Sequence, residues 1–334
     1  MKKLFGFSLS LFIFVIFYSC DDIIEKNTPE NVFEVFWRTM DENYVYFEEK
    51  GIDWDSIYNI YSLQAKNAVN DDDLRRIFRE IIHSFTDRNI ILFTDKEWIF
   101  SWTPYDDDNK EDTVYLPYAW QLLEGFDVKQ DEQHFYCSEN KEKHITYFHP
   151  YVRWGEQNIN TIKRGIFLDS LDCVNGLIID LTSNAAGDVM NFISAFFTGE
   201  KIVYYIQDKS GKGHNDFGNK VPLTLQGDGY VADSVPIVIL TNRNTYNGCN
   251  WIIYALADLR NHCTVIGTPT GGGGGSTRSV FLPNGWKFEF PDAKLFSSSG
   301  RNMEYEFKPD IYAEGDDIYQ VAIEFLDSLR TAKQ

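Results

Sequence analysis

Apolar residues recur at helical spacing along the first part of the chain. The segment 28–47 opens the predicted helical region, because Thr28 is a residue type that caps helices and Pro29 fits the first helical turn. Further on, an acidic turn at 71–73 precedes a run from 74 to 85 whose apolar positions fall on one helical face. The pattern predicts an N-terminal helical region over residues 20–95.

The pattern changes after residue 95 and again after residue 165. Residues 96–165 are rich in aromatic and turn-forming residues, which indicates a connecting region of short strands. From 166 to 334, buried strands alternate with helices, and strand, helix, strand in succession predicts a parallel sheet covered by helices. The expected strands are 175–184, 234–242 and 263–268, and the expected helices are 249–261 and 188–199, the latter ended by Gly199.

The first 19 residues form a predicted secretion signal. Two lysines precede an apolar run over about 11–18, and Cys20 closes the run before two aspartates. This resembles a bacterial lipoprotein signal, in which Cys20 is lipidated and anchors the exported protein to a membrane of the cell envelope. A transmembrane anchor is the alternative, although the run is shorter than the ~20 apolar residues of a spanning helix. Whether the protein faces the periplasm or lies on the outer membrane stays open.

Composition excludes some kinds of partner. With 50 acidic and 31 basic residues the net charge is −19, which repels nucleic acid phosphates. The cysteines at 137, 173, 249 and 263 match no zinc ligand spacing, so we expect no metal and no other cofactor. The five glycines at 271–275 lack the ending of a phosphate loop and indicate a flexible loop, which could serve as a lid beside the cleft.

Two turns at the ends of predicted strands carry the candidate chemistry. In "LTNRNTYNGCNW", Asn247 stands where a strand meets a helix, and the amide of Gly248 is placed to stabilise an oxyanion. The turn "SNAAGD" offers a second backbone donor from Ala186 or Gly187. Together these amides form the donor half of an acyl-transfer site.

Several segments in order resemble the tail-specific, or carboxyl-terminal processing, serine peptidases, in particular their tricorn-protease-like branch among exported bacterial lipoproteins. They include "NYVYFEEKGIDWDSIYNIY", "DDDLRRIFREIIHSFTDRNIIL", "GLIIDLTSNAAGD", "LTNRNTYNG", "VIGTPTGGGGG", "LPNGWKFEFP" and "EYEFKPDI". The resemblance implies an α/β core of the crotonase type over 166–334 after the helical region. The family often inserts a PDZ-type peptide-binding module, for which residues 96–165 carry no clear sequence.

The departures from the family pattern fall on its catalytic residues. The nucleophilic serine corresponds to Asn247 and the histidine of the Asp-Gly-His motif to Asn89. An amide side chain has neither an ionisable proton nor a basic lone pair, so it can neither attack a carbonyl nor accept a proton. The carboxylate that orients the site in the tricorn-like branch corresponds to Glu304, with Glu306 as the alternative. No lysine lies between 247 and 286 to serve the family's serine and lysine variant.

These features predict a lipid-anchored pseudoenzyme that binds peptides or the carboxyl-terminal tails of proteins. An active serine-type endopeptidase with a relocated nucleophile is one alternative, and its candidates are Cys249, Ser276 and Ser297 to Ser299. A scaffold subunit of an envelope assembly is the other, because the 26 Phe, 19 Tyr and 8 Trp residues can furnish an interface.

Overall fold

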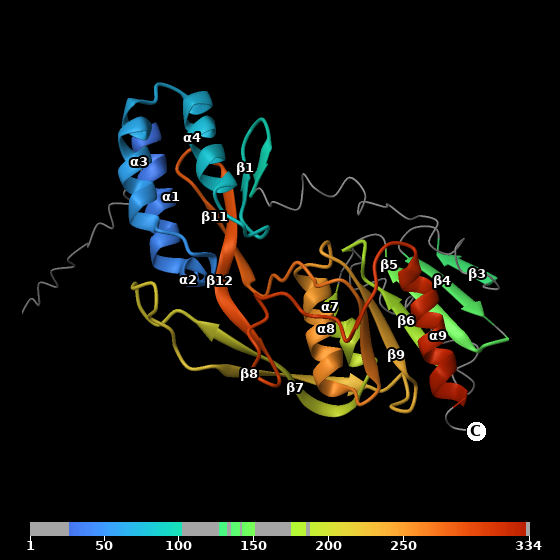
Figure 1. Ribbon diagram of the computed structural model, residues 1–334. Helices are drawn as coiled ribbons and strands as arrows, with labels where there is room; N and C mark the ends of the chain where they lie inside the picture. Colours follow the sequence, from blue (N-terminus) through green and yellow to red (C-terminus); the bar gives the residue numbers. More distant parts are fainter. Residues whose placement is uncertain are drawn as a thin grey trace, which may run out of the picture.

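The protein is a mixed α/β molecule, seen in a computed structural model, and its described residues form two sheets (Figure 1). The structure describes residues 27–101, 127–131, 135–140, 142–150, 175–184 and 188–331. The predicted signal, Cys20, and the turn residues Ala186 and Gly187 lie outside these ranges. Across the described part of the chain, no helix has the length and apolar character to span a membrane.

The long N-terminal helices α1 and α4 begin at capping side chains, of which the sequence predicted Thr28. The side chain of Thr28 accepts a hydrogen bond from the amide of Asn31, and that of Asn70 accepts one from Asp73. One face of each long helix is buried among aromatic side chains, which gives this region its own core. The helices are α1 (Pro29–Asn43), α2 (Phe47–Lys50), α3 (Trp54–Asn67) and α4 (Asp71–His83).

An antiparallel sheet joins these helices to the rest of the molecule. Its order is β2-β1-β12-β7-β8, with β11 also paired to β12. The ring of Phe36 in α1 lies 4.8 Å from that of Phe288, so the helices pack on the end of β12, and Figure 1 shows β12 running from there toward the second sheet. The strands are β1 (Ile91–Phe93), β2 (Trp98–Phe100), β7 (Thr198–Asp208), β8 (Val221–Asp228), β11 (Ser276–Phe281) and β12 (Lys287–Ser297).

The second sheet has the order β13-β10-β9-β6-β5-β4-β3, and its strands from β5 to β13 run parallel, as the strand and helix alternation predicts. Helices α7 and α8 pack against one face and α9 against the other. The helices are α7 (Val189–Ser194), α8 (Gly248–Leu259) and α9 (Asp317–Thr331). The strands are β3 (Asp127–Asp131), β4 (Phe135–Asn140), β5 (Ile145–Pro150), β6 (Gly176–Asp180), β9 (Ile237–Thr241), β10 (Cys263–Gly267) and β13 (Ile311–Tyr312).

Three details differ from the sequence expectations. The helix expected over 188–199 ends at Ser194, because the next residues turn into the core and Thr198 already begins β7. The strand β1 lies inside the region expected to be helical up to residue 95. Strands β3 to β5, before the expected boundary at 165, pair into the same sheet as the later strands.

Candidate functional site

The turn between β9 and α8 holds its tip residue in a strained backbone conformation. Asn247 has φ 49° and ψ −116°, a combination that side chains with a Cβ rarely adopt. Its amide donates to the carbonyl of Gly272 at 3.0 Å, and its carbonyl accepts from Trp251 at 2.9 Å. No described residue accepts a hydrogen bond from the amide of Gly248, the first residue of α8. The turn therefore presents a free backbone donor at the positive end of a helix.

The two residues that replace the family's nucleophile and base contact each other. Asn247 Nδ2 donates to Asn89 Oδ1 at 2.5 Å, although the two lie on separate elements, the α8 turn and the loop before β1. Asn89 is buried, and within the described chain its Nδ2 has no hydrogen-bond partner. A buried donor without a partner costs free energy. The structure thus brings these residues together with an unused donor beside them.

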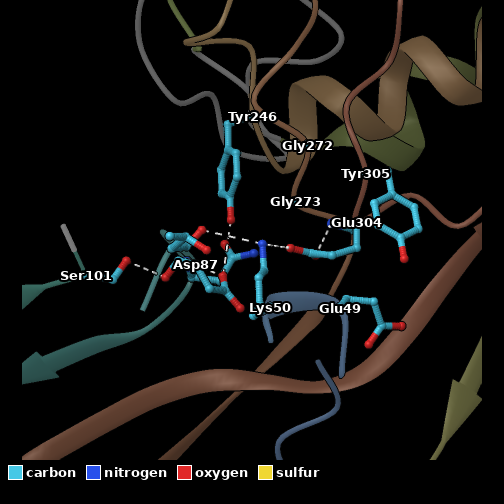
Figure 2. Close-up of polar contacts among 12 residues, drawn as sticks. Glu49, Lys50, Asp87, Ser101, Tyr246, Gly272, Gly273, Glu304 and Tyr305 are labelled. Carbon is cyan, nitrogen blue, oxygen red and sulfur yellow. Dashed lines mark hydrogen bonds and ion pairs between the residues drawn. The ribbon is translucent and has the colours of Figure 1, made fainter. Parts of the chain in front are cut away.

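Asp87 is the centre of a buried polar cluster behind this pair. Its carboxylate accepts a hydrogen bond from the hydroxyl of Tyr246 at 3.2 Å (Figure 2). It also accepts from the hydroxyl of Tyr44 at 2.8 Å and from the amide of Asn89 at 2.9 Å. Burial first, and then the charge of Asp87, raise the pKa of both tyrosines well above the ordinary value. Both hydroxyls therefore stay protonated and donate to Asp87, while Ser101 donates to its backbone carbonyl.

Glu304 completes the cluster from the other side. Its Oε1 lies 2.5 Å from Lys50 Nζ, and its Oε2 accepts from the amide of Gly274 at 2.9 Å (Figure 2). Burial, followed by repulsion from Asp87, raises the pKa of Glu304 to about 7, against the lowering effect of Lys50. Burial is the largest single effect on Lys50 and acts to lower its pKa, but the charges of Glu304, Asp87 and Glu49 and the hydrogen bond to Glu304 together raise it. Lys50 therefore stays charged, and Glu304 changes charge near neutral pH.

The glycine run expected to be a flexible lid is instead packed tightly against the site. Gly272 and Gly273 have φ of 80° and 84°, and a Cβ on them would lie 2.4 Å from the Glu304 carbonyl and 2.6 Å from the Tyr246 ring. Gly273 also donates to the carbonyl of Glu304 at 3.2 Å. The lid expectation is wrong, because this run needs glycine for close approach rather than for mobility.

The other candidates lie elsewhere. Glu306 is exposed, whereas Glu304 belongs to the cluster. Cys249 is fully buried in the core face of α8, and Ser276 begins β11. Ser297 to Ser299 form a bonded turn, in which Asp258 accepts hydrogen bonds from Ser298 and Ser299.

Lys50 and Asp87 are site residues that sequence reasoning missed, together with the two tyrosines. The signal was present, because Asp87 occupies the aspartate position of the family's Asp-Gly-His motif, two residues before Asn89. Tyr44 and Lys50 lie within "NYVYFEEKG", a segment that already carried the resemblance. Their convergence depends on contacts between distant segments, such as Lys50 with Glu304 and Tyr246 with Asp87, which no local pattern reveals.

Comparisons with known proteins agree with the predicted resemblance. Residues 157–313 match the model of peptidase family S41, and residues 26–83 match that of the tricorn protease C1 domain. The chain is similar to the crystal structure of a candidate peptidase from Parabacteroides merdae ATCC 43184, at 25% identity and a TM-score of 0.74, covering 90% of this chain and 97% of that one. A search of curated proteins finds no match.

Two further solved structures share the fold at lower identity. A lipoprotein from Streptococcus agalactiae is 16% identical with a TM-score of 0.60, covering 91% of this chain and 97% of its own. The photosystem II D1 C-terminal processing protease is 13% identical with a TM-score of 0.52, covering 86% of this chain and 93% of that one.

Proposed function

Because residues 157–313 of the chain belong to peptidase family S41, we propose that the protein is an exported, lipid-anchored member that binds peptides or protein carboxyl-terminal tails without cleaving them. In this proposal the α/β part is a core of the crotonase type preceded by the helical region. Cys20 carries the lipid that holds the protein at the cell envelope. The lipoprotein among the structures of the same fold supports this location.

The hydrogen bond between Asn247 and Asn89 carries the proposal of inactivity. At 2.5 Å the two side chains stand as a nucleophile and its base would stand, but both are amides. Neither has a proton to lose or a lone pair basic enough to take one. A peptide carbonyl at this turn therefore meets hydrogen-bond donors and no attacking group.

The free donors at the turn support the binding half of the proposal. The amide of Gly248 and the Nδ2 of Asn89 both lack described partners, and both can donate to a carboxylate or carbonyl oxygen. The helix dipole of α8 adds a favourable field for an anionic group. Ala186 and Gly187 are the proposed further donors from the neighbouring turn. A carboxyl-terminal tail supplies the matching acceptor.

A binding comparison tests the proposal. We expect the full chain to bind a fluorescent peptide with a free carboxyl terminus more tightly than the same peptide amidated there, and to release no new peptide termini from unfolded proteins. Asn247→Asp adds a negative charge at the turn without changing its shape, and should weaken binding of the free-acid peptide about tenfold. The matched control Asn244→Asp adds the same charge in the same loop and should have a smaller effect. Equal affinity for both peptides, or cleavage by the wild type, would refute the proposal.

A further inference from the structure

The strand β2 ends one sheet with an edge that no other described strand covers. Among the described strands it pairs only with β1, in the register Leu92 opposite Ile99, and backbone bonds from Thr94 to Glu97 and from Ser101 to Ile90 lie on either side. Hydrogen-bonded and non-hydrogen-bonded residue pairs alternate along an antiparallel ladder, so the backbone N–H and C=O groups of Ile99 point toward β1. The backbone N–H and C=O groups of Trp98 and Phe100 therefore point away from the sheet, where no described residue bonds to them.

A cavity of about 320 Å³ follows this edge. It is lined by Glu97 to Ser101, which include all of β2, and by Arg79 and His83 of α4. Among the described residues none from β1 lines it, which places the cavity on the open side of β2. An added strand would have room there, and polar side chains on its α4 side would meet Arg79, His83 and Glu97.

On the face of β2 turned away from α4, the exposed side chains suit the apolar side of an extended peptide. Trp98 and Phe100 are 64% and 49% exposed, and their rings lie 6.3 Å apart on the face turned away from the helical core. Uncovered edge strands with exposed apolar side chains readily accept another strand. Edge pairing obtains affinity from main-chain bonds and specificity from alternate side chains.

We infer that the open edge of β2 is a second peptide-binding site, which takes an extended segment of unfolded polypeptide as an added strand. The occupant has apolar side chains at alternate positions, against Trp98 and Phe100, and polar ones between them. This site goes beyond the proposed binding site at the Asn247 turn and requires no carboxyl terminus. Ser101, which follows β2, donates to the carbonyl of Asp87, so the edge ends beside the buried cluster around Asp87.

The test uses a fluorescent peptide acetylated at its start, amidated at its end, and alternating Val with Thr and Glu, so that it offers no terminal carboxylate. We expect the full chain to bind it by anisotropy. Phe100→Pro removes the outward N–H without touching the bonds to β1, since proline is tolerated at such edge positions. It should weaken binding about tenfold more than the control Phe100→Ala, which loses the same ring but keeps the N–H.

A second measurement leaves the protein unchanged. The same peptide carrying N-methyl groups at alternate residues on its pairing edge should lose binding to the wild type, whatever the folding of Phe100→Pro. Asn247→Asp should bind the amidated peptide as the wild type does. The inference is overturned if the N-methylated peptide binds equally well, if Phe100→Pro and Phe100→Ala bind alike, or if Asn247→Asp abolishes binding, which would place the peptide at the turn.

Discussion

The turn at Asn247 and the buried cluster around Asp87 differ in the polar side chains that they contain. At the turn, Asn89 and Asn247 are neutral and bond to each other. Behind it, Asp87, Lys50 and Glu304 are ionisable side chains, and both carboxylates are buried. Burying charges costs free energy that only pairing and hydrogen bonds offset. The buried cluster is therefore costly in free energy and held by pairing, whereas the turn carries two neutral amides.

The residues that fix the shape of the site are therefore different from the two residues at the positions of the nucleophile and its base. The cluster fixes the loop of Asn89, the turn of Asn247 and the glycine run relative to one another through Tyr246, Asp87 and Glu304. None of these bonds involves the side chain of Asn247. The geometry of the turn is thus held by groups that do not depend on the identity of the residue at its tip.

The largest expected effect comes from restoring chemistry at the turn. Asn89→His together with Asn247→Ser should raise hydrolysis of unfolded proteins about 100-fold or more above the wild type, because the side chains already stand within hydrogen-bond distance. New peptide termini are counted by mass spectrometry. Each single variant is the control and should stay near the wild-type level. A double variant that folds but does not cleave would mean that the framework is not preorganised for catalysis.

The pH dependence of the free energy of unfolding tests the raised pKa of the buried Glu304. Glu304 has a folded pKa raised to about 7 from 4.5, so the folded state binds this proton more tightly than the unfolded state. Its contribution to stability is present below about pH 4.5 and is lost as pH rises to about 7, and the displacement corresponds to roughly 3 kcal/mol.

Glu304→Gln should flatten that part of the stability curve, measured by urea unfolding from pH 4.5 to 8. The exposed Glu306→Gln is the matched control and should leave the slope unchanged. Equal slopes in the wild type and Glu304→Gln would contradict the assignment of this proton to Glu304.

The smallest expected effect concerns the strained backbone. Asn247→Gly should stabilise the protein by about 1 kcal/mol, since glycine adopts φ 49° and ψ −116° without steric cost, and this relief exceeds the lost bond to Asn89. Asn244→Gly is the control in the same turn, where φ is not positive, and should destabilise by about 0.5 kcal/mol. Thermal unfolding of both variants decides the point. A destabilised Asn247→Gly would show that the side-chain bond outweighs the strain.

The sequence by itself determined the helical start of the chain, the helix α8, the parallel strands β6, β9 and β10, and the position of the turn. The cap at Thr28, the acidic turn at 71–73 and the helical spacing of apolar residues are local signals, and they predicted the starts of α1 and α4 nearly to the residue. Buried strands such as β6 and β9 are predicted by short apolar runs in the sequence. The two amides at positions 89 and 247 were also visible, because the resemblance aligns each with one catalytic position.

Only the tertiary structure decided what surrounds that turn. Strands β7 and β8 carry many exposed positions, so their sequences lack the apolar pattern that marks a buried strand. The glycine run has the composition of a flexible loop, yet contacts with Tyr246 and Glu304 fix it. The pairing of Lys50 with Glu304 joins residues far apart in the chain. Such contacts depend on how elements that are far apart in the chain pack together, and no local sequence pattern encodes that packing.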